Sequence, residues 1–312
     1  MDLLEEAKIH TKQKTPFFYK FFSLFSVVRG YNIAIMLLAQ ILSAVFVFAP
    51  NQPVRSVLFD YNLLALLLAT ASAVAGGYII NHFYDAGKDA INRPVKTKLD
   101  TYISKKTKLY SYFILNFISV GFGFIVSFRA GFFFSVYIFL LWFYSHKLKR
   151  YPLTGLFGGV VLTLLPFFAV FAYYKNFEEI IFAHAGFLFF MLILKDLVKD
   201  LENLKGDMLF NYETIVVKYG EHFTRLLISL VVLMSFFPLF FLLRYPEIGY
   251  MKYYFVVSII VLTMVGILVW FSRNKRNYLF LHNLLKFIIV LGVLSLILLD
   301  TSVIIERILQ RL

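Results

Sequence analysis

The stretch NLLALLLATASAVAGGYIINHFYDAGKDAINRP runs from Asn62 to Pro94 and changes character at Asn81. Residues 62–80 carry no charge, whereas the rest places Asp85 and Asp89 four residues apart, where a membrane helix is expected to end. A related stretch, LKDLVKDLENLKGD, covers residues 194–207 and also follows an apolar segment. We call residues 81–94 the first acidic run and residues 194–207 the second acidic run.

The composition is that of an integral membrane protein. Hydrophobic residues make up 60% of the 312 residues, charged residues only 16%, and the mean hydropathy is +0.77. A soluble chain of this length could not bury that much apolar surface in one or two cores. The chain contains no cysteine, which excludes disulfides and thiolate metal sites. Its N-terminal part lacks a signal-peptide cleavage pattern, so we expect the first hydrophobic helix to be retained.

The apolar segments predict an all-α membrane protein with nine transmembrane helices in a bundle. A spanning helix needs about 20 mostly apolar residues. Backbone groups in lipid must be paired internally, which favours helices, and no alternating barrel pattern is visible. The predicted spans are 27–49, 62–84, 109–127, 130–144, 153–174, 179–198, 224–243, 253–271 and 283–305.

The basic residues predict the orientation of this bundle. With nine helices, the side of the membrane that holds the N-terminus carries 23 of the 31 Lys and Arg residues, and the other side carries seven. The positive-inside rule therefore places the N-terminus and both acidic runs in the cytoplasm. We expect a cytoplasmic segment at 1–26 and one transmembrane domain at 27–312. Contact with anionic lipids accounts for the net charge of +13 without nucleic acid.

The two acidic runs hold six of the 18 acidic residues. Asn81, Asp85 and Asp89 are spaced i, i+4, i+8, so they share one helical face, and Asp196 and Asp200 repeat the spacing. Close carboxylates repel unless a cation compensates them. Paired hard oxygen ligands suit Mg²⁺ together with substrate phosphates. The alternative is two amphipathic helix ends whose acids pair with nearby lysines. The repeat also favours two parallel half-bundles.

At these residues the sequence resembles the UbiA-type intramembrane prenyltransferase superfamily. The first acidic run matches the family motif Asn-x-x-x-Asp-x-x-x-Asp and the Asn-Arg-Pro that follows it. The other acidic run resembles Lys-Asp-x-x-Asp-x-x-Gly-Asp, found in the branch containing digeranylgeranylglyceryl phosphate synthases, with Asn203 replacing the middle aspartate. The segments VVRGYN (27–32), YSHKLKR (144–150) and TIVVKYG (214–220) are similar to other family segments. The resemblance covers at least residues 29–220, and the family has nine membrane helices.

This resemblance implies transfer of a polyprenyl group from an allylic diphosphate, with Mg²⁺ neutralising the leaving group. The implied metal ligands are Asn81, Asp85, Asp89, Asp196, Asp200 and Asp207, of which Asp85, Asp89, Asp200 and Asp207 are the catalytic carboxylates. The candidates for binding the diphosphate are Asn81, Arg29, Asn32, Arg93, Lys147, Lys149 and Lys199. An allylic cation requires a dry site with aromatic faces, and Tyr144 is our candidate for that wall.

The expected partners are a geranylgeranyl-like diphosphate donor, a lipophilic acceptor and membrane lipids, with the active site facing the cytoplasm of a multi-pass membrane protein. The second motif favours geranylgeranylglyceryl phosphate as the acceptor, while quinone precursors, other aromatics and tetrapyrroles stay open. Two alternatives remain at this point. One is a secondary transporter that uses intramembrane carboxylates, and the other is an enzyme of the same fold with different chemistry.

Overall fold

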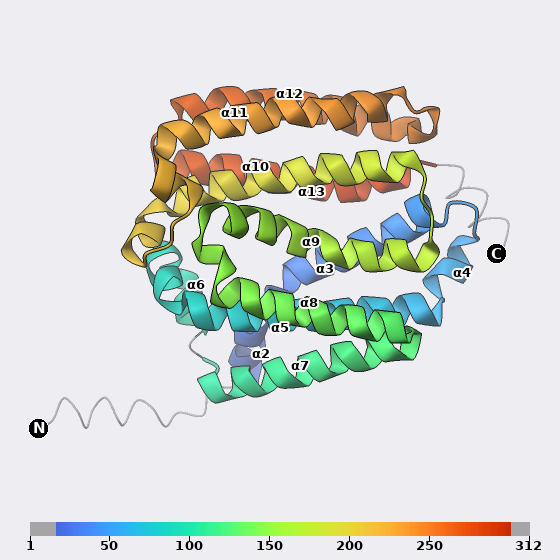
Figure 1. The fold of residues 1–312 in the computed structure, drawn as a ribbon, viewed down its shortest axis with the longest axis horizontal. Helices are drawn as coiled ribbons and strands as arrows, with labels where there is room; N and C mark the ends of the chain where they lie inside the picture. The colour runs from blue at the N-terminus through green and yellow to red at the C-terminus, as the bar shows by residue number, and fades with distance from the viewer. Residues whose placement is uncertain (1–16, 101, 301–312) are drawn as a thin grey trace, which may run out of the picture.

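The computed structural model describes residues 17–100 and 102–300, and all regular secondary structure within them is helical (Figure 1). In these ranges nine helical segments are long and apolar enough to cross a membrane, which confirms the predicted fold class. The spans are α3 with η2 (Gly30–Ser43, Ala44–Phe48), α5 (Tyr61–Asn92), α7 (Lys105–Val126), α8 with η3 (Phe128–His146, Leu148–Arg150), α9 (Pro152–Tyr174), α10 (Glu179–Leu209), α11 (Ile215–Arg244), η4 with α12 (Pro246–Met251, Lys252–Phe271) and α13 with η5 (Lys275–Ser295, Leu296–Leu298).

The two helices that carry the acidic runs are longer than the sequence predicted. α5 has 32 residues and α10 has 31, against predicted spans of 62–84 and 179–198. At about 1.5 Å per residue, each is close to 48 Å long, which exceeds a hydrocarbon core of about 30 Å. α5 continues to Asn92 because the first helix-ending residue after the apolar stretch is Pro94. Both acidic runs are therefore the ends of rigid helices and not loops.

The starts of two other helices also differ from the predicted ones. α11 begins at Ile215 and not at 224, although Gly220 has a positive φ of 83° that separates its first turn from the rest. α13 begins at Lys275 and not at 283, because the polar residues at its start still form helix. Residues 301–305 of the predicted last span, and residues 1–16 of the predicted N-terminal segment, lie outside the described residues.

The side chains pack into two main groups of helices, and α9 contributes to both. One buried cluster joins α10, α11, α12, α13 and part of α9 around Leu194, Phe255 and Leu262. Another joins α5, α8 and α9 around Ala69 and Phe134, with α7 packed on its outer side. A third cluster connects the two groups through α3 with η2, α5, α9 and α10. This third cluster joins the starts of α5 and α10, far along each helix from the acidic runs.

Three short helices complete the described chain: α2 (Phe17–Val27), α4 (Val54–Leu58) and α6 (Pro94–Asp100). With 11 residues, α2 is too short to span a membrane. It packs against α6 and α3, and the Ser26 hydroxyl donates a hydrogen bond to Asp100 Oδ1 at 2.8 Å. Phe18 and Phe21 on α2 are exposed, which is typical of a helix lying in the membrane interface.

Candidate active site

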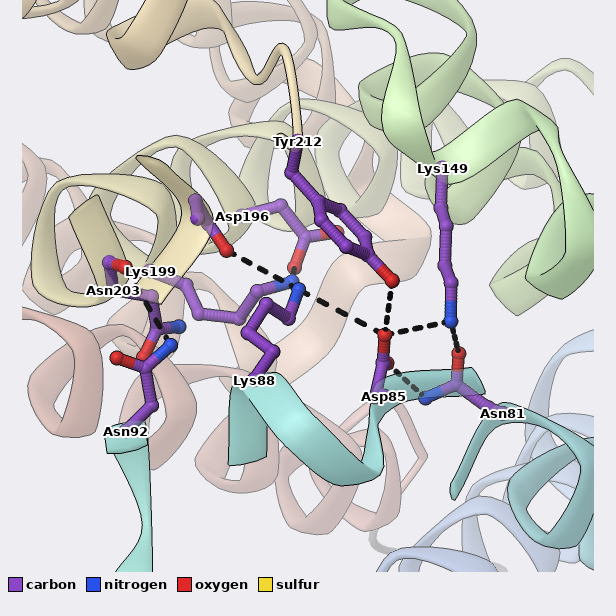
Figure 2. A network of polar contacts seen from close by, with 10 residues as sticks. Asn81, Asp85, Lys88, Asn92, Lys149, Asp196, Lys199, Asn203 and Tyr212 are labelled. Atoms are coloured by element: carbon purple, nitrogen blue, oxygen red, sulfur yellow. Dashed lines mark hydrogen bonds and ion pairs between the residues drawn. The ribbon is translucent and has the colours of Figure 1, made fainter. Parts of the chain in front are cut away.

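Asp85 is the centre of the polar network at the end of α5 (Figure 2). It is buried among the neighbouring helix ends. One helical turn earlier, the Asn81 side chain donates a hydrogen bond from Nδ2 to Asp85 Oδ2 at 2.9 Å. This is the i, i+4 pairing that the spacing of the first acidic run predicted.

Two further side chains reach Asp85 from distant parts of the chain. Lys149, on the short helix η3, lies with Nζ 2.8 Å from Asp85 Oδ1 and also donates to Asn81 Oδ1 at 2.8 Å. Tyr212 follows α10, and its hydroxyl donates to Asp85 Oδ1 at 2.7 Å. Figure 2 shows these side chains converging on Asp85. The carboxylate thus accepts hydrogen bonds from three separate segments.

The backbone conformation around Tyr212 brings its side chain to Asp85. Asn211 adopts a left-handed conformation with φ of 54°, which an asparagine tolerates better than most residues. The chain then turns back, so that the Tyr212 amide donates to the carbonyl of Asp207 at 2.9 Å. The next amide, of Glu213, donates to the carbonyl of Arg150 at 2.8 Å, which ties this loop to η3. Burial, with the nearby charge of Asp85, raises the pKa of Tyr212, so its hydroxyl stays a donor.

Lys88 joins the two acidic runs. Its Nζ lies 3.2 Å from Asp207 Oδ1, on α10, and 4.0 Å from Asp85 Oδ1, on α5. Both carboxylates are buried. The resemblance implies one site that uses the acids of both runs, and Lys88 brings Asp85 and Asp207 to one place through its two contacts.

In the second acidic run, Asp196 is paired within its own helix. Lys199 Nζ lies 3.1 Å from Asp196 Oδ1, and Lys195 Nζ lies 3.5 Å from the same oxygen. Tyr144 lies beside this group, because a side-chain carbon added at Gly159 would be 2.8 Å from the Tyr144 hydroxyl and 3.8 Å from Asp196 Oδ2. Gly159 therefore permits the approach of Tyr144, whose hydroxyl donates to the Gly155 carbonyl at 2.9 Å.

Asp89 and Asp200 differ from their neighbours, since within the described residues neither forms a hydrogen bond or an ion pair through its side chain. No group of three or more His, Cys, Asp or Glu side chains in the described ranges could hold a metal ion by itself. Mg²⁺, however, keeps several waters and commonly takes one or two carboxylates plus substrate phosphates. The unpaired carboxylates of Asp89 and Asp200, one on each run, are oxygen donors of the kind that such an ion takes.

A cationic cleft of about 320 Å³ lies beside the first acidic run, and we call it the Arg29 cleft. Its lining residues are Phe22, Phe25, Ser26, Arg29, Tyr31, Arg93 and Lys96. Arg29 precedes α3 in a left-handed conformation, with φ of 50°, and its guanidinium lies 5.1 Å from the ring centroid of Tyr78. Asn32 donates to the Tyr78 hydroxyl at 3.4 Å. Burial, and the positive charge of Arg29, lower the pKa of Lys96.

The predicted basic residues thus lie in four different places. Lys149 contacts the first acidic run and Lys199 the second, while Arg29 and Arg93 line the Arg29 cleft. Lys147 is exposed, and its side chain makes no hydrogen bond or ion pair within the described residues. The structure does not bring it to the acidic runs.

Sequence reasoning missed Tyr212 and the bridging position of Lys88. Lys88 was considered only as a local partner of nearby acids. The only available signal for Tyr212 was its position five residues after Asp207. A further contact links the two runs, because Asn92 Nδ2 donates to the Asn203 carbonyl at 3.5 Å. A side chain at Gly206 would collide with Asn92, so this glycine permits the close approach of α5 and α10.

Comparison with known proteins identifies the family and the fold. Residues 37–287 match the model of the UbiA prenyltransferase family. The chain belongs to the UbiA prenyltransferase family. A digeranylgeranylglyceryl phosphate synthase of Methanobrevibacter smithii is 30% identical over 248 residues, which cover 76% of this chain and 82% of that protein. A synthase of the same name from Korarchaeum cryptofilum is 26% identical and covers 77% of this chain and 86% of its own length.

Solved UbiA structures share the fold. A UbiA homolog from Archaeoglobus fulgidus bound to DMAPP and Mg²⁺ superposes with a TM-score of 0.66 at 15% identity, covering 91% of this chain and 99% of that one. The resemblance to UbiA-type enzymes is thereby confirmed, and this UbiA-family protein is a polyprenyl transferase. Membership of a prenyltransferase family favours the enzyme over the secondary transporter considered from the sequence.

Proposed function

We propose that this UbiA-family protein transfers a geranylgeranyl-type group from its allylic diphosphate to geranylgeranylglyceryl phosphate, with Mg²⁺, at the cytoplasmic face of the membrane. The observation that carries the proposal is the convergence of the two acidic runs, in which Lys88 lies within 3.2 Å of Asp207 and 4.0 Å of Asp85. The names of the relatives supply the donor and acceptor classes. The sequence distribution of Lys and Arg supports the orientation.

The residues of the site have distinct roles in this proposal. When bound, Mg²⁺ would neutralise the charge that develops on the departing diphosphate, held by Asn81, Asp85, Asp89, Asp200 and Asp207. Asp196 is paired with Lys195 and Lys199 instead. Lys149 keeps Asn81 and Asp85 in place through two 2.8 Å contacts, and Tyr212 fixes the orientation of Asp85. As the carbon–oxygen bond to diphosphate breaks, the electron pair leaves with the diphosphate. The acceptor hydroxyl oxygen bonds to the prenyl carbon and gives up its proton to the released diphosphate.

Tyr144 is proposed to shield the allylic cation. It lies at the second acidic run, close to Asp196, where an aromatic face would stabilise positive charge and exclude water. Its hydroxyl already donates to the Gly155 carbonyl. That hydrogen bond satisfies the polar end of the side chain and keeps the ring in one position.

The Arg29 cleft supports an acceptor that carries a phosphate. Arg29, Arg93 and Lys96 bring three positive charges to one cleft next to the first acidic run, and Lys96 Nζ lies 3.9 Å from Asp100 Oδ2. The pKa of Lys96 is lowered by burial first, and then by repulsion from Arg29 and Arg93. A phosphate monoester, with close to two negative charges and several acceptor oxygens, relieves that repulsion better than the single carboxylate of an aromatic acid.

The test uses the full chain in lipid nanodiscs with radiolabelled geranylgeranyl diphosphate. Either geranylgeranylglyceryl phosphate or an aromatic acid is supplied as acceptor, with Mg²⁺ or with EDTA. We expect a labelled ether lipid only with the glycerol phosphate acceptor and Mg²⁺. A product that forms only with the aromatic acid, or that forms equally well in EDTA, would contradict the proposal.

A variant of the cleft separates acceptor binding from donor binding. Lys96→Met should raise the KM for geranylgeranylglyceryl phosphate by about tenfold, because a charge-assisted hydrogen bond is lost, while the KM for the donor changes little. Lys106→Met is the matched control, since Lys106 is an exposed lysine on α7. Equal effects of the two substitutions on the KM for the acceptor would contradict the assignment of the Arg29 cleft to acceptor binding.

A further inference from the structure

The position of Lys88 has a consequence for how many metal ions the site requires. Its Nζ lies between carboxylates of the two acidic runs and also 4.1 Å from the ring centroid of Tyr212. Figure 2 shows the Lys88 amine between the two runs, pointing toward Asp85 and Tyr212. The side chain itself is largely shielded, with 18% of its surface exposed. The Lys88 ammonium therefore occupies the space between the two runs, where a metal ion that bridges them would otherwise bind.

The local geometry makes this position specific to residue 88. Lys88 follows Asp85 by three residues, so the two side chains share one face of α5. That face lies against α10, where Asp207 is almost completely buried. Two buried carboxylates this close to one cation would repel one another if it were removed. An ammonium fixed to the chain supplies a compensating charge whether or not a divalent ion is bound.

The second acidic run differs from the motif that it resembles by one negative charge. Asn203 stands where the motif that it resembles has an aspartate, so this run has one carboxylate fewer. In the structure, Asn203 lies beside Asn92 through its backbone carbonyl. Lys88 adds one positive charge relative to a neutral residue, and Asn203 removes one negative charge relative to an aspartate. The two residues together make the site more positive by two charge units. A divalent ion supplies the same two units.

We propose that the Lys88 ammonium takes the place of one divalent cation between the two acidic runs, so that this protein binds its diphosphate substrate with one metal ion fewer than the same site without the lysine. This inference rests on the proposed prenyl transfer for the identity of the ligand. Lys88 then contacts the diphosphate oxygens directly. The remaining metal is held through Asp89 and Asp200, which have no other charged partner within hydrogen-bond or ion-pair distance in the described residues.

The experiment counts bound metal without turnover. Wild-type protein in nanodiscs is saturated with a non-reactive thiolo analogue of geranylgeranyl diphosphate and titrated with Mn²⁺, and bound Mn²⁺ is quantified by electron paramagnetic resonance. Lys88→Met is expected to bind one additional Mn²⁺ per protein. Lys88→Arg, which keeps the positive charge, and Lys205→Met, at an exposed position on α10, are expected to bind the wild-type number.

An unchanged or reduced count in Lys88→Met would overturn the proposal and leave Lys88 as an ordinary ion-pair partner. An additional ion in Lys205→Met as well would also overturn it, because the effect would then follow from net charge alone. If Lys88→Met does not fold, Lys88→Gln is judged by the same count. Failure of the proposed function gives a different result, since wild-type protein would then neither bind the analogue nor transfer the labelled prenyl group.

Discussion

The two acidic runs have similar sequences but are held in different ways. Asp85, in the first run, is contacted by Lys149 from η3 and by Tyr212 from the loop after α10, at 2.8 Å and 2.7 Å. Asp196, in the second, pairs with Lys195 and Lys199 of its own helix. The first carboxylate therefore depends on the tertiary fold, and the second depends on its sequence neighbours.

Because of this difference, the two runs should respond differently to substitution. The ion pairs of Asp196 form whenever α10 is helical, and they involve partly exposed side chains that water can replace. Those of Asp85 form only when three segments assemble around a buried carboxylate, and loss of that carboxylate would leave buried ammonium groups uncompensated. Substitutions around Asp85 should therefore cost more than substitutions around Asp196.

The largest effect is expected for Asp85→Asn. This change keeps the shape of the side chain but removes the charge that compensates Lys149 and Lys88. We expect the rate of prenyl transfer at saturating Mg²⁺ to fall about a hundredfold or more, measured with radiolabelled donor. A loss below about tenfold would show that the first run is no more sensitive than an ordinary surface pair.

The two basic residues of the loop after α8 provide the next test. Lys149→Met removes the contacts that hold Asn81 and Asp85, and activity should fall about 10-fold to 100-fold, as for other residues that orient metal ligands. Lys147→Met, at the exposed neighbouring position, should cost less than about fivefold. The initial rates of prenyl transfer by both variants measure this difference. A larger loss for Lys147 would reverse our assignment of the two residues.

Tyr212→Phe isolates one hydrogen bond, because the ring that faces Lys88 is kept. We expect a loss of about tenfold in rate. The pKa of Tyr212 is raised, so the hydroxyl is protonated below and slightly above the usual tyrosine pKa of about 10. The ratio of wild-type to variant rate should therefore be the same at neutral pH and at about pH 9.5. A ratio that shrinks toward alkaline pH would mean that Tyr212 ionises within that range.

The smallest effect is expected for Asp196→Asn. The pairs that it removes join neighbours on one partly exposed helix face, so the rate should fall by about fivefold at most. The same transfer assay measures it, with Asp85→Asn as the reference. A loss as large as that of Asp85→Asn would indicate that Asp196 is a metal ligand in its own right and that the contrast between the runs does not extend to catalysis.

Much of the fold and part of the site followed from the sequence. The nine apolar segments were found because a lipid-facing helix must be apolar along its whole length. The lengths of α5 and α10 were underestimated, since a hydropathy argument does not distinguish amphipathic turns beyond the membrane from loops. Lys147 and Lys149 could not be separated, because both belong to one basic segment and only the turn at η3 decides which of them points inward.

The membrane class, the spacing of Asn81, Asp85 and Asp89 on one helix face, and the placement of Lys195 and Lys199 next to Asp196 follow from the sequence alone. They depend on helical periodicity and on the apolar solvent, which act over a few residues at a time. The contacts of Tyr212 and Lys149 with Asp85, and of Lys88 with Asp207, depend instead on the folded chain. Those contacts join residues up to 127 positions apart, and their geometry depends on how α5 and α10 pack, which no local pattern records.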